Sequence, residues 1–233
     1  GQEIQKVGPY GFLFLLPYCA VYFFDTMGWK YSFCHEIPVS FKTLFPVRLA
    51  GESINYTTPT AYLGGEPLKA YILAKRNIPF SHGLASVIIS KFLMTVMEVV
   101  FILLGIEIAV AVLGKRDSWF QVLLVVFVFF AIFLFFFLVM QKEGLGKRLV
   151  NLVKKVKFFS QAVTAQEKNI TEFDAILANY YKNEKQQIFF SCVSFFCGWC
   201  SGALEIYILL QLMGYTNITI PVALALEAVS VAA

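Results

Sequence analysis

The chain has 233 residues, of which 58% are hydrophobic and only 15% are charged, and it contains 25 phenylalanines. Its mean hydropathy is +0.70, whereas a soluble domain carries charge on about 25% of its residues. These values exclude a soluble enzyme. They predict an integral membrane protein of the all-α class, with several membrane-spanning helices and a location in the cell membrane.

Apolar segments follow one another along the chain. We expect spans at about residues 9–33, 83–113, 119–140 and 188–213, and the start of another span at 218–233. A helix rises about 1.5 Å per residue, so each complete segment is long enough to cross a hydrocarbon core of about 30 Å. The whole chain is therefore predicted to form a single transmembrane domain.

At both ends of the chain, the sequence pattern leads us to expect further residues in the natural protein. The last apolar segment stops at Ala233 without a cap or a polar tail. We therefore expect the natural chain to continue beyond this residue. The charge-based orientation described below places residue 1 outside, which suggests that a further span precedes it.

Two segments between the first and second spans are less regular. Apolar and basic residues alternate over residues 35–55, which favours an interfacial amphipathic helix. Residues 56–76 hold Pro59, Gly64 and Gly65, a combination that breaks regular structure. Such a segment is either a re-entrant element lining a cavity or a plain cytoplasmic loop with a surface ion pair.

The loop at residues 141–187 is strongly basic, although the net charge of the chain is only +4. It lies between two predicted spans, so it is typical of a cytoplasmic loop that obeys the positive-inside rule rather than of a nucleic-acid binder. Residues 42–76 then lie on the same, inner side. No nucleic-acid partner is expected.

Charged residues near or within the predicted spans are the candidate site residues. Glu66 and Lys69 are three residues apart at the start of a short helix, and Lys91 and Glu98 are seven apart on the second span. A charge at membrane depth costs about 2.5–3.5 kcal/mol on insertion scales, so these groups are expected to face protein or water. They form either structural pairs or the lining of a path.

We expect no catalytic residues, no cofactor and no metal site. The sequence has no phosphate-binding loop, nucleophile elbow, zinc-protease motif or dinucleotide fingerprint. Its five cysteines give no metal signature, because the C-x-x-C of Cys197 and Cys200 lies in an apolar stretch, and they are interpreted as small hydrophobic residues.

The segment around Glu66 resembles a known family. The residues Gly65-Glu66-Pro67-Leu68-Lys69-Ala70-Tyr71, with Leu73 after them and Ala85-Ser86-Val87 opening the next helix, are similar to the hallmark of the lysylphosphatidylglycerol synthase transmembrane-region family, also called flippase-like domain proteins. The resemblance implies movement of a polar lipid across or between leaflets. It also implies an inverted repeat with a second re-entrant element. Family members often carry an acidic–basic pair where this chain has Ser90-Lys91, so only the basic member is present.

The resemblance favours a membrane lipid flippase or transporter whose headgroup path is lined by Pro59, Gly64, Gly65, Glu66, Lys69, Lys91 and Glu98. The expected ligand is an anionic or modified phospholipid or an isoprenoid lipid. Three alternatives stay open: a small-solute or ion transporter, a non-catalytic scaffold for a lipid-modifying enzyme, and an intramembrane lipid transferase. A second copy of the chain or a lipid-modifying enzyme is the expected protein partner.

Overall fold

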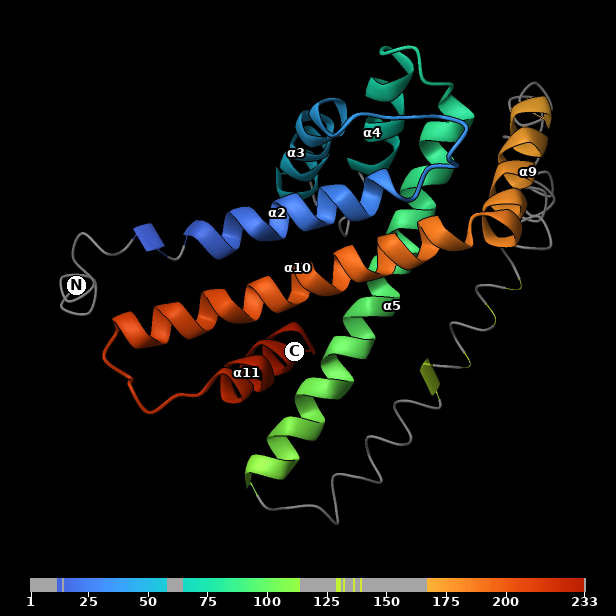
Figure 1. The fold of residues 1–233 in the computed structure, drawn as a ribbon. Coiled ribbons are helices and arrows are strands. Elements are labelled where there is room, and N and C mark those ends of the chain that lie inside the picture. Colours follow the sequence, from blue (N-terminus) through green and yellow to red (C-terminus); the bar gives the residue numbers. More distant parts are fainter. Residues whose placement is uncertain are drawn as a thin grey trace. The chain divides into compact units, whose positions relative to one another are not determined.

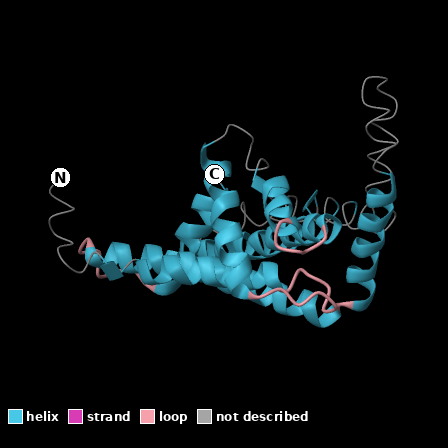
Figure 2. Cartoon of the chain, turned by 90° about the horizontal axis from the view of Figure 1, so that it is seen from above, coloured by secondary structure: helices cyan, strands magenta, loops and turns pink. Residues whose placement is uncertain are grey.

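A computed structural model describes residues 12–13, 15–57, 65–113 and 167–232, together with helical residues at 129, 130, 132, 136 and 139. Its elements in these ranges are helices, with no strand among them (Figures 1 and 2). In chain order they are α2 (Leu15–Lys30), α3 (Phe41–Thr57), α4 (Gly65–Ala74), α5 (Phe80–Leu113), α9 (Glu167–Asn183), α10 (Lys185–Leu212) and α11 (Ile220–Ala232). The predicted all-α class is confirmed.

Two of the described helices are long and apolar enough to cross a membrane. They are Phe80–Val112 within α5 and Lys185–Leu212, which contain 18-residue stretches with mean hydropathies of 2.3 and 1.6, respectively. They correspond to the spans predicted at 83–113 and 188–213. The shorter apolar helix α11 lies where the last span was predicted to start. Most of the span predicted at 119–140 is outside the described residues.

The helix α2 corresponds to the predicted first span. Pro17 lies in its first turn, where the missing backbone N–H has no partner to lose, so the helix runs on without a break. Asp25 also lies inside the helix and is buried.

The described residues belong to two packing units, which we call the first and the second unit. The first comprises residues 1–25, 94–132 and 192–233, and the second comprises 26–93 and 133–191. This division concerns packing alone, so the expectation of a single transmembrane domain stays a prediction.

The core of the first unit is built from small and aromatic side chains. Phe101, Ala203 and Ala228 are buried together, and the Phe101 ring stacks on that of Trp199 at 6.1 Å between centroids. Gly105 of α5 lies against Ala228 of α11 so closely that a β-carbon would collide with the alanine methyl. Small residues therefore allow α5 and α11 to approach closely, as is common between membrane helices.

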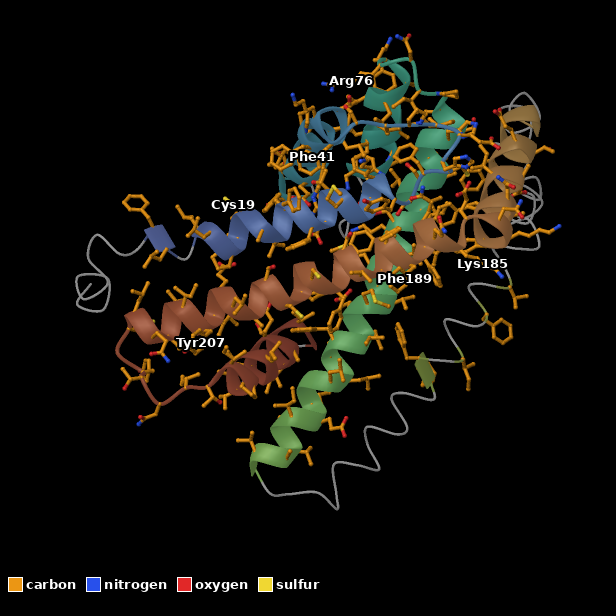
Figure 3. The ribbon with its side chains drawn as sticks, viewed as in Figure 1. Cys19, Phe41, Arg76, Lys185, Phe189 and Tyr207 are labelled. Carbon is orange, nitrogen blue, oxygen red and sulfur yellow. The ribbon has the colours of Figure 1, made fainter. Side chains whose placement is uncertain are left out.

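The second unit has a core of large apolar side chains. Its buried members are Trp29, Phe33, Val39, Leu44, Val47, Leu73 and Val87, which come from α2, the segment after it, and α3, α4 and α5. The helices α3 and α4 pack against each other (Figure 1). Arg76, labelled near the end of α4 in Figure 3, donates from Nη1 to the backbone oxygen of Thr43 at 3.3 Å.

The helix α9 is part of the second unit, and its residues form most of the second half of the basic loop predicted at 141–187. Its residues Phe173, Leu177 and Tyr180 are buried. The hydroxyl of Tyr180 donates to the backbone oxygen of Tyr31 at 2.8 Å. This part of the loop is thus a packed amphipathic helix. Residues 141–166 of the loop lie outside the described residues.

Candidate functional site

The candidate site is built on the close contact between α3 and α4. A β-carbon added at Gly65 would collide with the backbone carbonyl of Gly51 on α3. The N–H of Gly65 donates to the side-chain oxygen of Asn55 at 2.7 Å. The first turn of a helix has N–H groups without intrahelical partners, and Asn55 satisfies one of these at the start of α4. The start of α4 is thereby fixed against α3.

Glu66 and Lys69 form an ion pair within the first turn of α4. The Lys69 ammonium donates to both carboxylate oxygens of Glu66, at 3.2 and 3.1 Å. Each side chain is only 11% exposed. The carboxylate lies near the N-terminus of α4, where the helix dipole favours negative charge. Burial lowers the pKa of Lys69 below its ordinary value, and the negative charge of Glu66 opposes this effect.

A second lysine reaches the same carboxylate from α5. The Lys91 ammonium lies 3.5 Å from Oε1 of Glu66, and its side chain is 44% exposed. Glu66 therefore serves two ammonium groups, one buried and one partly open to the surroundings. We call Glu66, Lys69 and Lys91 the lysine–glutamate cluster.

The buried lysine is held in place from several sides. The Lys69 ammonium lies 5.8 Å from the centroid of the Trp29 ring, within cation–π range. Trp29 in turn donates from Nε1 to the hydroxyl of Ser86 on α5 at 3.2 Å. The aliphatic part of Lys69 also lies over Gly51, where a β-carbon would collide with it. The Lys69 side chain is fixed by packing as well as by charge.

The cluster has a neighbouring ion pair on α3. Arg48 Nη2 lies 2.6 Å from Glu52 Oε1, and the two side chains are 11% and 21% exposed. The positive charge of Arg48 also acts on Lys69. Arg48 and Glu52 thus add a cation and a carboxylate to the described surroundings of Lys69.

The structure brings together four of the predicted site residues: Gly65, Glu66, Lys69 and Lys91. Pro59 and Gly64 lie outside the described residues. Glu98 lies on α5 but in the first unit, so its relation to the cluster stays a prediction.

Sequence reasoning missed four residues that position the cluster, namely Trp29, Gly51, Asn55 and Ser86. Trp29 is distant in the sequence from Glu66, and no local pattern connects the two, whereas Ser86 belongs to the family resemblance but was not predicted as a site residue. The combination of Gly51 and Asn55 four residues later offers a weak signal, because it places a small residue and a capping residue on one face of α3.

The second unit also contains an open pocket of about 410 Å³ that none of the cluster residues line. Its lining includes Lys30, Tyr31, Cys34, His35 and Gln187. His35 faces Glu184, with Nδ1 at 3.3 Å from the carboxylate. Burial, reinforced by the negative charge of Glu184, raises the pKa of the Cys34 thiol. This pocket is separate in its residues from the predicted site.

The fold and the cluster define a helical membrane protein that keeps paired charges in the first turn of α4. The sequence model of the family described as "Lysylphosphatidylglycerol synthase TM region" matches residues 2–233, and the chain belongs to this family. The resemblance stated from the sequence is confirmed.

One curated relative is similar over most of this chain. A UPF0104 membrane protein of Methanothermobacter thermautotrophicus is 24% identical over 188 residues, which cover 77% of this chain and 55% of that protein. The chain thus spans about half the length of the curated relative that it matches. No solved structure matches the chain.

Proposed function

We propose that this chain moves the polar headgroups of membrane lipids between leaflets, with the lysine–glutamate cluster as the point of contact for the headgroup. The observation that carries the proposal is the sharing of one carboxylate, Glu66, between a buried and a partly exposed lysine. A charge at membrane depth is costly and is retained where it meets a partner or a substrate. An exposed charge beside a buried pair can exchange its partner.

The path for the headgroup is proposed to run along the contact between α3 and α4, and α4 is proposed to belong to a re-entrant element. Irregular backbone at membrane depth is tolerated where it lines a cavity or is buried in protein. The α4 helix has only 10 residues and cannot cross a bilayer alone. In this arrangement the acyl chains stay in the bilayer while the headgroup passes the cluster. Such movement requires no covalent step.

The experiment is a lipid-movement assay with the full natural protein in proteoliposomes. A fluorescent phospholipid is included in both leaflets, and a membrane-impermeant quencher is added outside. Protein that moves headgroups makes the inner-leaflet fluorophore accessible, so the quenched fraction rises above that of protein-free liposomes. The variants Glu66→Gln and Lys69→Gln are expected to slow this movement.

The matched control is Lys75→Gln, since Lys75 is an exposed lysine directly after the same helix and its ammonium lies 5.4 Å from the Tyr71 ring centroid. It should move lipid at the rate of the wild-type protein. Folding of every variant is checked by thermal unfolding in detergent. Wild-type protein that matches empty liposomes across several headgroups contradicts the proposal, and so does equal slowing by Lys75→Gln and the two cluster variants.

A further inference from the structure

We infer that the open pocket at the end of α2 binds a small amphiphilic carboxylate from the aqueous phase, with the Lys30 ammonium as its counter-ion. We call this site the α2 pocket. It is separate from the lysine–glutamate cluster, and the inference does not depend on the proposed function.

The first argument is the size and position of the α2 pocket. It has a volume of about 410 Å³ and is lined by the end of α2, the segment that leads to α3, and the first turn of α10. Pockets for small molecules measure about 300–1,000 Å³ and are mostly apolar, with a few polar groups that fix the ligand's orientation. The lining residues His35 and Ser40 are exposed, so a molecule in solution can reach the pocket.

The second argument is that the lining combines apolar and polar side chains. Phe33 and Val39 are buried in the core of the second unit, and Ile37 packs against that core. All three also line the pocket, so this apolar surface is held by packing. Lys30 and Gln187 line it as half-buried polar side chains. The pocket therefore offers both hydrocarbon contact and polar groups, which an amphiphilic ligand requires.

The third argument is that these two polar groups have no polar partner within the described residues. The Lys30 ammonium lies 5.8 Å from the centroid of the Tyr31 ring, and no described carboxylate lies within ion-pair distance of it. The Gln187 amide likewise has no hydrogen bond to the described part of the chain. A carboxylate can accept hydrogen bonds from an ammonium and from an amide. The pocket thus holds the two donors that a single ligand carboxylate needs.

The fourth argument limits the charge of the ligand. None of the described lining residues is acidic, but two carboxylates act on the pocket from nearby. Burial is the main cause of the raised pKa of the Cys34 thiol in the lining, and the negative charges of Glu184 and Glu36 add to it. Glu184 is engaged by His35, whose backbone nitrogen and ring Nδ1 lie 3.2 and 3.3 Å from Oε1. One ammonium in these surroundings favours a single negative charge over the charge of about −1.5 to −2 on a phosphate monoester.

The test is photolabelling of the full natural protein in detergent with an octanoic acid that carries a diazirine in its chain. Mass spectrometry of peptides locates the label. We expect it in residues 30–40 or at the start of α10, and an excess of octanoate should remove it there. Label that is spread over the apolar helices and that octanoate does not remove would overturn the inference.

Competitors of equal chain length separate the effect of charge from that of the hydrocarbon. Octanoate should compete more strongly than the neutral octanamide, the cationic octylammonium and the more highly charged octyl phosphate. Acetate, which has the charge without the hydrocarbon, should compete weakly. Equal or stronger competition by any of the three octyl compounds would overturn a site for a single carboxylate. Much stronger competition by dodecanoate than by octanoate would indicate a fatty acid taken from the bilayer and would overturn the aqueous source.

The variant Lys30→Gln should weaken octanoate competition about tenfold, the size of one hydrogen bond to a charged group. Lys30→Arg should retain most of the affinity, and octanamide competition should stay nearly unchanged in both variants, a result that a merely structural role of Lys30 does not give. The matched control Lys42→Gln removes an exposed lysine of α3 that does not line the pocket. Equal weakening by Lys30→Gln and Lys42→Gln would show a general effect of surface charge and would overturn the inference.

A second variant keeps the test independent of the behaviour of Lys30. Gln187→Leu removes the amide without changing the charge and should weaken octanoate competition about fivefold. Thermal unfolding in detergent checks the fold of each variant. Octanoate competition that neither Lys30→Gln nor Gln187→Leu changes, in folded protein, contradicts the site. Labelling and lipid movement are separate readouts, so the failure of one leaves the other standing.

Discussion

The backbone of Gly65 lies so close to the carbonyl of Gly51 that no side chain, not even a methyl group, fits between them. This contact fixes the start of α4 against α3, and with it the position of the Glu66 carboxylate. Because a backbone carbonyl cannot turn aside as a side chain can, the fit depends on glycine at residue 65.

We predict that Gly65→Ala destabilises the protein by about 1–3 kcal/mol, the usual cost of forcing extra atoms into a packed interior. The control is Gly83→Ala, because a β-carbon at Gly83 meets Ala70 and Leu73 at 3.4 Å or more, which is ordinary contact. Thermal unfolding in detergent measures both. A melting temperature that falls equally in the two variants contradicts a special contact between α3 and α4.

A second prediction follows from the unequal partners of the cluster. Glu66→Gln leaves the buried Lys69 without its carboxylate, a loss that costs about 3 kcal/mol for a buried pair. Lys69→Met is expected to cost less, because Glu66 keeps Lys91 at 3.5 Å. The double variant Glu66→Gln/Lys69→Met should recover part of the stability lost in Glu66→Gln. Unfolding of the three variants under one condition measures this order, and equal losses in the two single variants contradict it.

The same pair predicts a dependence of stability on pH. The pKa of Lys69 is lowered in the folded protein, chiefly by burial. The unfolded chain therefore binds more protons than the folded one as the pH approaches the ordinary lysine value of about 10.4. Stability contributed at this residue should rise as the pH increases toward that value. The rise should be larger in Glu66→Gln, which lacks the opposing carboxylate, and absent in Lys69→Met.

The parts of the fold that follow from local composition were predictable from the sequence. Long apolar segments predicted α5 and α10 to within three residues at each end. The short helix α4 followed from its Gly-Glu-Pro start, because proline is tolerated in a first helical turn. The pairing of Glu66 with Lys69 followed from their spacing on that helix.

The surroundings of the cluster could not be predicted in the same way. Lys69 meets Trp29, 40 positions earlier in the chain, and Trp29 is tied to Ser86 by a contact over 57 positions. These contacts depend on how α2, α4 and α5 pack, and a single sequence carries no periodic signal for them. The contact of Lys91 with Glu66 has the same origin, whereas the sequence places Lys91 and Glu98 on one helix face, either as a structural pair or as the lining of a path.

Another prediction concerns the hydrogen bond from Trp29 to Ser86. Ser86→Ala leaves the buried indole N–H without an acceptor, which costs about 1–3 kcal/mol. Trp29→Phe removes the donor together with its need for a partner, and the Ser86 hydroxyl still donates to the backbone oxygen of Gly83 at 2.8 Å. We therefore expect the loss of this hydrogen bond alone to cost at least as much stability in Ser86→Ala as in Trp29→Phe. Melting temperatures of the two variants and of Trp29→Leu, which also loses the aromatic face beside Lys69, test this order.

A separate prediction addresses the first unit. A β-carbon at Gly105 would collide with the methyl group of Ala228, so Gly105→Ala should force α5 and α11 apart and lower stability by about 1–3 kcal/mol. Ala228→Gly removes the colliding methyl group, so the double variant Gly105→Ala/Ala228→Gly should recover part of the loss. The recovery is partial because the backbone oxygen of Leu224 would still lie 3.2 Å from the new β-carbon.

Gly202→Ala is the comparison for this pair. There the nearest atom is the Glu227 carboxylate at 2.9 Å, the far end of a flexible side chain. We expect a smaller loss of stability, since the carboxylate can move aside. A loss of stability at Gly202 as large as that at Gly105, or no recovery in the double variant, would contradict the claim that the close contact of α5 with α11 requires glycine at residue 105.

The last prediction tests whether α10 crosses the membrane. Its 28 residues extend about 42 Å at 1.5 Å per residue, which exceeds a hydrocarbon core of about 30 Å. The basic segment before it is expected on the inside and the turn after it on the outside. Lys182 and Tyr215 are both exposed and mark these two sides. Cysteines placed at the two positions should therefore differ in their reaction with a membrane-impermeant maleimide.

The measurement needs a background in which all five native cysteines are replaced, because Cys19 is itself exposed. In intact cells Tyr215→Cys should be labelled and Lys182→Cys should not, and after permeabilisation both should react. Labelling of both positions in intact cells would place α10 along the surface instead of across the bilayer. The reverse pattern would keep α10 as a span but invert it, and would put the lysine–glutamate cluster nearer the outer leaflet than the charge distribution predicts.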